Sequence, residues 1–305
     1  MSPIKRFLLM LALTCLWSPS FLFIKLAVQE LPPITVVALR VSLAACVLLA
    51  ILALRQTPMP KSWGFWMHMC AMALFASVLP FCLFCYAEQN IDSALAAILN
   101  GTTPMFTAIL AQLFVPSDRM NKQKIFGVLL SCIGVILLFA PKLFEGVSGT
   151  TLGMSAALVA SFSYAVSHVY GKLYLTGLKP YVAPTTQIIV SSMMVWPLAM
   201  YHEQPWTLPI PSMSAMIGVC GLALLGTVGA FILYYKLLEH CGPTAVSAVA
   251  CFFPLGGMFL GFIFLNEAFS STGLVAAAII LLGMLSVNEV VSFDFLQKKE
   301  ESTID

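Results

Sequence analysis

Charged residues are scarce in this chain, and their scarcity excludes a soluble globule. Only 9% of the 305 residues are charged, 60% are hydrophobic, and the mean hydropathy is +0.96. A soluble chain of this size needs far more polar sequence to cover its surface. No polar stretch is long enough for a soluble domain. The lipid bilayer is therefore the expected solvent, and nucleic acid is not an expected partner.

Hydrophobic runs of membrane-spanning length fill most of the sequence. A helix needs about 20 apolar residues to cross a hydrocarbon core of about 30 Å. Ten candidate spans, the fifth of them short, lie at residues 7–28, 34–54, 63–86, 94–115, 125–140, 152–175, 182–200, 213–235, 245–265 and 272–291. The sequence thus predicts an all-α membrane protein with ten transmembrane helices.

Basic residues between the spans predict the orientation. Twelve of the 15 lysines and arginines fall on the side shared by both termini, Lys142 alone falls on the other side, and Lys25 and Arg40 lie within spans. Cytoplasmic loops carry the excess of basic residues, so both termini are expected in the cytoplasm. The first run lacks a small-residue cleavage pattern and is expected to be a retained span. We expect a multi-pass protein of the cytoplasmic (inner) membrane of a bacterium.

The nine cysteines give little reason to expect metal or redox chemistry. Eight lie inside predicted spans, where they serve as small apolar residues. Cys82 and Cys85 have CxxC spacing, but no second cysteine or histidine pair lies nearby to complete a zinc site. No metal, cofactor or catalytic residue is therefore predicted.

A spacing pattern from the first quarter of the chain recurs past its midpoint. One offset of 147 superposes two sets of four residues, namely Trp17, Lys25, Pro33 and Arg40 on Tyr164, Lys172, Pro180 and Gln187. At an offset of 150, Ser77 meets Thr227 and Pro104 meets Pro254. A unit of five helices, an odd number, must be repeated with inverted topology. The expected units are residues 1–141 and 142–305, the second ending in a short cytoplasmic tail.

Pro104 and Pro254 lie near the centres of the fourth and ninth spans. A proline inside a helix removes one hydrogen bond and frees the carbonyl four residues earlier, which belongs to Asn100 in the first case and Ala250 in the second. Such breaks are tolerated in a bilayer where protein or a water-filled cavity satisfies the carbonyl. A simple kink, with threonines bonding their own helix, is the alternative. The matched pair favours a cavity.

Aromatic and hydroxyl side chains inside the spans indicate where this cavity lies. Spacings of three and four place two corresponding trios on single helical faces, one in the first span and one in the sixth. The predicted substrate-cavity residues are Trp17, Ser20, Phe21, Arg40, Tyr86, Asn100, Thr103, Pro104, Tyr164, Ser167, His168, Gln187, Tyr234 and Pro254.

Arg40 lies about 10 Å inside the second span. No aspartate or glutamate is expected deep in a span, and Glu88 is assigned to the border of an outer loop. Arg40 is then either a structural anchor, bonded to helix ends, carbonyls, water or an outer carboxylate, or a contact for an anionic substrate. Lys25 is expected to be an interfacial anchor or a partner of Glu88. Without a buried carboxylate, facilitated diffusion or exchange is favoured over proton coupling.

The chain resembles the EamA type of the drug/metabolite transporter superfamily over residues 7–290. The resemblance rests on the stretch Leu16 to Arg40, the two central prolines, the acidic turns at Asp118 and Glu267, and the GVILL segment from Gly134. It implies ten helices in two inverted repeats around a central cavity, and export of amino acids or other small metabolites. Trp17 and Ser18 stand where the family usually has Trp-Gly, and Pro19, which follows them, is expected to bend the first helix differently.

The leading hypothesis is therefore a secondary transporter that moves small metabolites by alternating access, and the resemblance implies export of amino acids or related compounds. Exchange-type uptake of a nucleoside-like cofactor such as S-adenosylmethionine is an alternative implied by the resemblance. A membrane sensor or assembly protein without transport activity is a second alternative. An enzyme is disfavoured because the spans lack clustered acidic and basic groups. The expected partners are a small-molecule substrate and the lipid bilayer, and both a monomer and a homodimer remain open.

Overall fold

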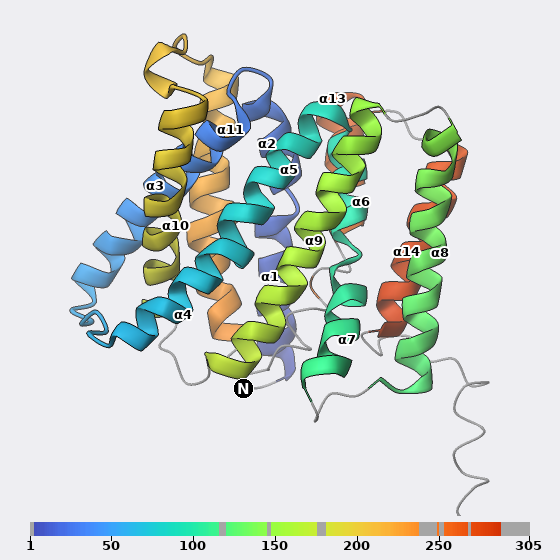
Figure 1. Cartoon of the computed structure of the whole chain (residues 1–305), viewed down its shortest axis with the longest axis horizontal. Coiled ribbons are helices and arrows are strands. Elements are labelled where there is room, and N and C mark those ends of the chain that lie inside the picture. Colours follow the sequence, from blue (N-terminus) through green and yellow to red (C-terminus); the bar gives the residue numbers. More distant parts are fainter. Residues whose placement is uncertain are drawn as a thin grey trace, which may run out of the picture.

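The computed structural model describes residues 3–115, 120–144, 148–175, 181–237, 249, 253–267 and 270–287, with side chains for all of these except 3–7, 139–144 and 254. All regular elements in this part of the chain are helical (Figure 1). In order they are α1 (Pro3–Trp17), α2 (Ser20–Val28), α3 (Pro33–Leu54), α4 (Trp63–Ala73), η1 (Leu74–Val78), α5 (Leu79–Asn90), α6 (Ser93–Asn100), α7 (Thr103–Phe114), α8 (Lys122–Phe144), α9 (Gly149–Tyr174), α10 (Val182–His202), η2 (Pro205–Thr207), α11 (Met213–Ala223), η3 (Leu224–Gly229), α13 (Phe253–Leu265) and α14 (Ser271–Val287).

Seven helices within the described ranges are long and apolar enough to cross a bilayer. They are Leu8–Val28, Pro33–Leu54, Trp63–Asn90, Ser93–Phe114, Gly149–Tyr174, Val182–His202 and Met213–Leu237. The first four and the sixth to eighth predicted spans are thereby confirmed. The fifth, ninth and tenth coincide with α8, α13 and α14, whose described lengths are 23, 13 and 17 residues. The chain is an all-helical membrane protein.

Several spans are interrupted near their centres. The first span divides at Pro19, which has helical backbone angles and forms the N-cap of α2. The third and eighth spans each contain a π-helical segment, η1 beginning at Leu74 and η3 beginning at Leu224. These two starting residues are 150 apart, the same offset that superposes Ser77 on Thr227. π-Helical segments inside α-helices are frequent at functional sites.

The break in the fourth span lies at Asn100 to Pro104, and its carbonyls are satisfied within the protein. The Thr103 hydroxyl donates to the Asn100 carbonyl at 2.8 Å, and the Thr102 hydroxyl donates to the Leu99 carbonyl at 2.7 Å. Ser161 of α9 donates a second bond to Leu99 O at 3.1 Å. The threonines thus bond their own helix, as the kink interpretation expected, and the polar break is also held against α9.

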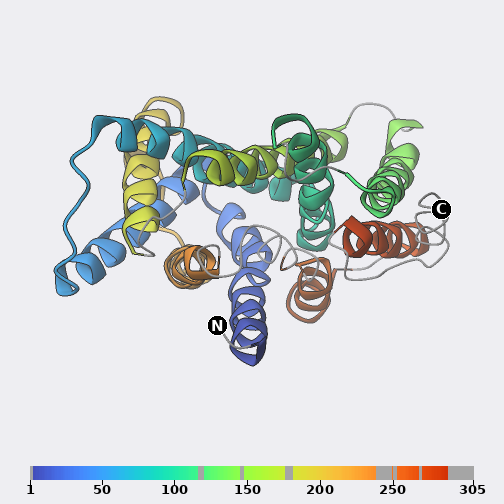
Figure 2. The ribbon, with the colours of Figure 1, turned by 90° about the horizontal axis from the view of Figure 1, so that it is seen from below.

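The helices form a broad bundle with two distinct ends (Figures 1 and 2). The α8–α14 pair lies at one end, and α3 packs against α10 at the other. Between them α5 packs on α9, and α2 packs on α11. Each of these four pairings joins a helix of the first half of the sequence to a helix of the second half. The buried core accordingly draws on residues from Leu13 to Met284.

Three carboxylates accept hydrogen bonds at the starts of helices that lie far away from them in the sequence. Glu203 accepts from the backbone N–H groups of Ile34 and Thr35, at the start of α3, at 3.0 and 2.6 Å. Glu267 accepts from the Ser93 and Ala94 N–H groups at the start of α6, at 2.7 and 3.0 Å. Acceptors at a helix start satisfy orphan N–H donors and complement the helix dipole. These bonds join one half of the sequence to the other.

Glu30 makes the reciprocal contact from the first half. It accepts bonds from the backbone N–H (2.7 Å) and the hydroxyl of Ser212, which precedes α11. The two bonds from Ser212 lower the pKa of Glu30 below its usual value of 4.5. A depressed carboxyl pKa means that this contact is present above about pH 4.5 and is lost as the pH falls through the lowered value.

Close packing of α8 on α14 depends on glycine, which yields a test of the fold. A Cβ atom on Gly283 would lie 2.7 Å from both the Gly127 carbonyl oxygen and the Ser131 nitrogen, and backbone cannot move aside cheaply. Gly283→Val should therefore destabilise the detergent-solubilised protein by about 1–3 kcal/mol, measured by thermal unfolding. Gly64→Ala is the control, because its Cβ would meet only Ser62 Oγ at 3.7 Å. Equal stability of the two variants would contradict this packing.

Candidate functional site

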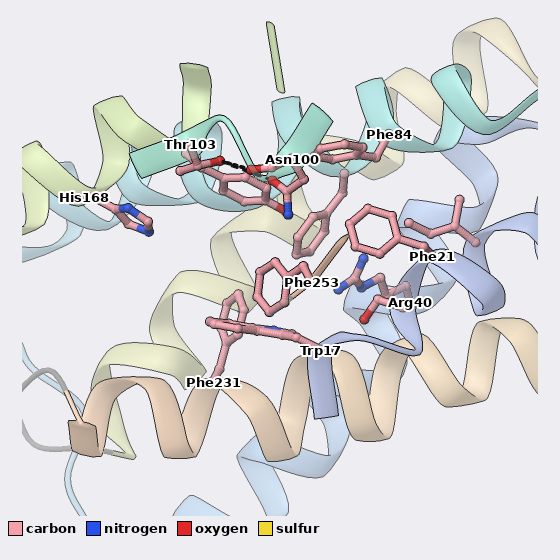
Figure 3. A pocket seen from close by; sticks show the side chains of 13 residues that line it. Trp17, Phe21, Arg40, Phe84, Asn100, Thr103, His168, Phe231 and Phe253 are labelled. Carbon is pink, nitrogen blue, oxygen red and sulfur yellow. Dashed lines mark hydrogen bonds between the residues drawn. The ribbon is translucent and has the colours of Figure 1, made fainter. Parts of the chain in front are cut away.

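A cavity of about 100 Å³ lies among the interrupted helices (Figure 3). It is lined by Trp17, Ser20, Phe21, Ile24, Arg40, Phe81, Phe84, Asn100, Thr103, Tyr164, His168, Phe231 and Phe253. A smaller cavity of about 40 Å³ shares Trp17, Tyr164, His168 and Phe231 with it. Figure 3 shows Arg40 and Phe21 at one end of the space and His168 at the other.

Arg40 is the charged side chain of this cavity, and it is 3% exposed. Its Nε donates to Thr227 Oγ1 at 2.8 Å, and its Nη2 donates to the Gly226 carbonyl at 3.4 Å, both in η3. Its Cζ lies 3.6 Å from the centroid of the Phe81 ring, a cation–π distance. A guanidinium has five N–H donors, so these bonds leave most of its donors unused.

The second half of the chain makes the corresponding contact. Gln187 of α10, which the offset of 147 places on Arg40, donates from Nε2 to Ser77 Oγ of η1 at 2.8 Å. Gln187 Oε1 accepts from the Tyr235 hydroxyl at 2.6 Å. A long polar side chain from each half thus binds a hydroxyl in the π-helical segment of the other half. One of the two is cationic and the other is neutral.

Aromatic rings form most of the remaining wall. The Trp17 indole N–H donates to the Gly226 carbonyl at 3.1 Å, which fixes the ring among Phe231, Tyr234 and Phe253, with centroids 6.5, 5.8 and 5.7 Å away. Tyr164 stacks with Phe84 at 6.1 Å, and His168 stacks with Tyr234 at 6.3 Å. Faces of this kind accept apolar groups, other rings and cations.

Eleven of the 14 predicted cavity residues line one of the two cavities. The larger holds Trp17, Ser20, Phe21, Arg40, Asn100, Thr103, Tyr164 and His168, and the smaller adds Ser167, Gln187 and Tyr234. Tyr86 lines neither, because its helical phase leaves it 39% exposed while Phe81 and Phe84 face inward. Pro104 is buried at the start of α7 but lines neither cavity. The side chain of Pro254 lies outside the described residues.

Four phenylalanines that line the larger cavity were not among the predicted residues. They are Phe81, Phe84, Phe231 and Phe253. Apolar rings in apolar spans give no polar signal, so composition could not separate them from lipid-facing residues. The repeat could have done so, because the offset of 150 places Phe81 on Phe231 and Phe84 on Tyr234.

Glu88 corrects the expectation that the spans contain no buried carboxylate. The helix predicted to end at Tyr86 continues to Asn90, so Glu88 lies within α5, and it is 0% exposed. Lys25, expected to be an interfacial anchor or a partner of Glu88, does not bond the Glu88 carboxylate. Its Nζ donates to the main-chain carbonyls of Glu88 and Ile91, at 2.7 and 2.8 Å.

Thiol and metal chemistry find no support in the described part of the chain. Cys82 and Cys85 are free thiols. The described residues also contain no group of three or more histidine, cysteine or acidic side chains that could hold a metal ion.

A bundle of apolar helices broken around an aromatic, partly polar cavity defines a membrane transporter. The chain belongs to the EamA-like transporter family, whose model matches residues 5–140 and again residues 151–288. This membership confirms the resemblance to the drug/metabolite transporters.

Curated relatives are similar over most of their length. The inner membrane transporter YedA of Escherichia coli (strain K12) is 26% identical over 90% of this chain and 88% of its own. A protein of the same organism named "Probable amino-acid metabolite efflux pump" is 23% identical over 92% of this chain and 93% of its own. A crystal structure, 17% identical, shares the fold with a TM-score of 0.69 over 95% of this chain and 99% of that one.

The bond between Arg40 and Thr227 gives a stability test. Thr227→Val removes the acceptor of a buried, charged donor, which should destabilise the protein by about 1.5–3 kcal/mol. Denaturant or thermal unfolding in detergent would measure the loss. Thr107→Val is the matched control, because the Thr107 hydroxyl bonds only the Thr103 carbonyl of its own helix. An effect of Thr227→Val no larger than that of the control would show that the guanidinium does not depend on this bond.

Proposed function

We propose that this protein is a secondary transporter for small metabolites that carry a carboxylate or phosphate, with export of amino acids or related compounds as its function. The observation that supports it is Arg40. Its guanidinium lies in the cavity, has N–H donors to spare, and forms no ion pair with a carboxylate in the described part of the chain. A buried cation without a counter-ion is costly, and an anionic substrate group would supply one through charge-assisted bonds.

The other walls of the cavity fit the rest of an amino acid. An ammonium group is attracted to the faces of Trp and Phe rings, and Trp17 and Phe253 lie 5.7 Å apart at their centroids. Asn100 and Thr103 add an amide and a hydroxyl from the opposite wall (Figure 3). The apolar rings would accept a hydrophobic side chain. The relative named as an amino-acid metabolite efflux pump supports the same substrate class.

Alternating access through two inverted five-helix units is the mechanism we propose. Three features support the duplication: the π-helical segments 150 residues apart, the corresponding pairs Arg40–Thr227 and Gln187–Ser77, and the two matches of the family model. We take residues 1–141 and 142–305 as the two units. Because the cavity is built from both, a rocking motion of one unit against the other would expose it to alternate sides.

Exchange-type uptake of a nucleoside-like cofactor is the second candidate function. The stacked Phe84 and Tyr164 rings favour it, since aromatic faces hold a base. A carboxylate on such a cofactor would also bind Arg40. The two candidates differ in direction and in substrate, so one transport panel separates them.

The Arg40 hypothesis predicts the result of a transport assay. Proteoliposomes tested with radiolabelled amino acids, phosphorylated metabolites and nucleoside-like cofactors should show uptake or efflux of at least one anionic compound. Arg40→Gln should raise the KM for that compound by about tenfold or more, since a charged hydrogen bond contributes about 1.5–3 kcal/mol. Arg55→Gln is the matched control, because Arg55 lies at the end of α3 over the Tyr181 ring, away from the cavity. Unchanged KM and kcat in Arg40→Gln would refute substrate contact.

The proposed orientation, with both termini in the cytoplasm of a cell with an inner membrane, has its own test. A reporter that is active only in the periplasm should be active when fused at Lys142 and inactive at the C-terminus, because basic residues are retained in the cytoplasm. A reporter active only in the cytoplasm should give the reverse pattern. Periplasmic activity at both positions would contradict the inverted repeat.

A further inference from the structure

Glu88 is a buried acid whose carboxyl group makes no hydrogen bond of ordinary geometry to the described residues. Neither of its carboxyl oxygens has a hydrogen-bond partner among the described residues, although the side chain is 0% exposed. Glu203, Glu267 and Glu30, whose carboxylates lie at the starts of α3, α6 and α11, each accept at least two hydrogen bonds. Glu88 therefore has no part in the capping that explains the other acidic residues near this end of the bundle.

The position of Glu88 connects it to the cavity. Phe84, one turn earlier on α5, lines the cavity, and its ring packs edge-on against Phe21 of α2 with centroids 5.7 Å apart. Lys25 lies one turn beyond Phe21 and bonds the end of α5. The Phe21–Phe84 layer thus separates the cavity from Lys25 and Glu88. Movement of α2 away from α5 would break this layer, release Lys25 and admit water to Glu88 together.

The charges around Glu88 come from several elements. Lys25 of α2 and Glu267, at the start of α6, interact with it electrostatically, as does Cys85 on its own helix. Asp92, between α5 and α6, interacts with the same lysine and glutamate. On α3 and α9, the titratable side chains that face the cavity are Arg40, Tyr164 and His168. Lys25 uses two of its three donors on carbonyls and does not bond the carboxyl group.

An ionised carboxylate that is buried without partners costs several kcal/mol or more, whereas a protonated one costs far less. We infer that Glu88 is a proton-binding site, and that the α2–α5 contact over the cavity closes only when Glu88 carries a proton. On opening, water reaches the carboxyl group, its O–H bond breaks, and the proton passes to water at that end of the bundle. On closing, a proton from the same water adds to a carboxylate oxygen. No other bond and no electron is transferred.

This inference deepens the proposed function, on which its meaning for transport rests. Because the proton is taken up from and returned to the water at one end of the bundle, closure at that end would depend on the pH of that side. The expected absence of buried carboxylates predicted no such dependence. Water access to the cavity would then change with pH. Closure itself can be measured without any substrate.

Infrared difference spectroscopy tests the protonation directly. The wild-type protein in detergent at neutral pH should show the C=O band of a protonated carboxylic acid, because Glu88 is buried without a bond to its carboxyl group, whereas Glu30, Asp92, Glu203 and Glu267 are exposed or accept hydrogen bonds. Glu88→Gln should remove that band, and Glu30→Gln should leave it. Absence of the band in the wild type would overturn the inference even if Glu88→Gln failed to fold.

Labelling of Cys85 tests the link to closure. This thiol is 0% exposed and lies three residues before Glu88. Maleimide labelling of Cys85 would be followed by peptide mass spectrometry and normalised to the unfolded protein at each pH. The normalised labelling rate of the wild type should rise by up to about tenfold per pH unit above the pH at which Glu88 titrates, since one proton is linked to opening. Glu88→Gln should stay slowly labelled at every pH, and Glu30→Gln should behave like the wild type. Equal pH profiles for the wild type and Glu88→Gln would overturn the inference.

The two proposals fail in distinguishable ways. A proteoliposome panel that shows no transport, with the Cys85 response intact, would reject the proposed function and keep the proton-linked closure. Transport of an anionic metabolite that is independent of pH, together with a flat Cys85 response, would keep the transporter and reject Glu88 as its proton site.

Discussion

In a bilayer a polar atom has to find its partner inside the protein, and here the important partners come from the other half of the chain. The Glu203 and Glu267 carboxylates supply acceptors to helices α3 and α6 of the first half, and Glu30 supplies them to α11 of the second. Each of these bonds joins a helix start in one half to a side chain of the other half. The same rule governs the middle of the bundle, where Arg40 and Gln187 each bind a hydroxyl in an opposite π-helical segment. Hydrogen bonds between polar groups therefore join the two halves both at the helix starts and in the middle of the bundle.

Once these bonds are assigned, the unpaired polar groups stand out. Arg40 has donors directed at a cavity without a carboxylate, and Glu88 has a carboxyl group without a donor, in each case among the described residues. Proteins keep such groups at functional sites, where the missing partner is a ligand. For Arg40 we propose an anionic substrate group, and for Glu88 a proton. The two lie on opposite sides of the Phe21–Phe84 layer, so one movement of α2 could affect both.

The membrane class, seven of the spans and 11 of the 14 residues placed at the cavities could be predicted from the sequence, because each can be recognised from the order of residues along the chain. Hydrophobic length identifies a span, and the fixed offset between Trp17 and Tyr164 brings their faces together. The reasoning failed where burial depends on tertiary packing. Glu88 looked like a loop residue because the apolar run ends at Tyr86, yet α5 continues to Asn90 under the cover of neighbouring helices. Capping by Glu203 joins residues about 170 positions apart along the chain, and no local pattern contains that information.

The differences between the halves bear most on function, because a scaffold built twice would otherwise treat its two ends alike. Arg40 corresponds to Gln187 and Phe21 to His168 at the offset of 147, and Glu88 corresponds to Leu238 at the offset of 150. Two of these differences place an ionisable side chain, Arg40 or Glu88, at a position where the second half has a neutral one. The proposed substrate contact and the proposed proton site therefore belong to one half, while the other half provides neutral counterparts at equivalent positions. An asymmetry of this kind would let proton binding favour closure at one end of the cavity.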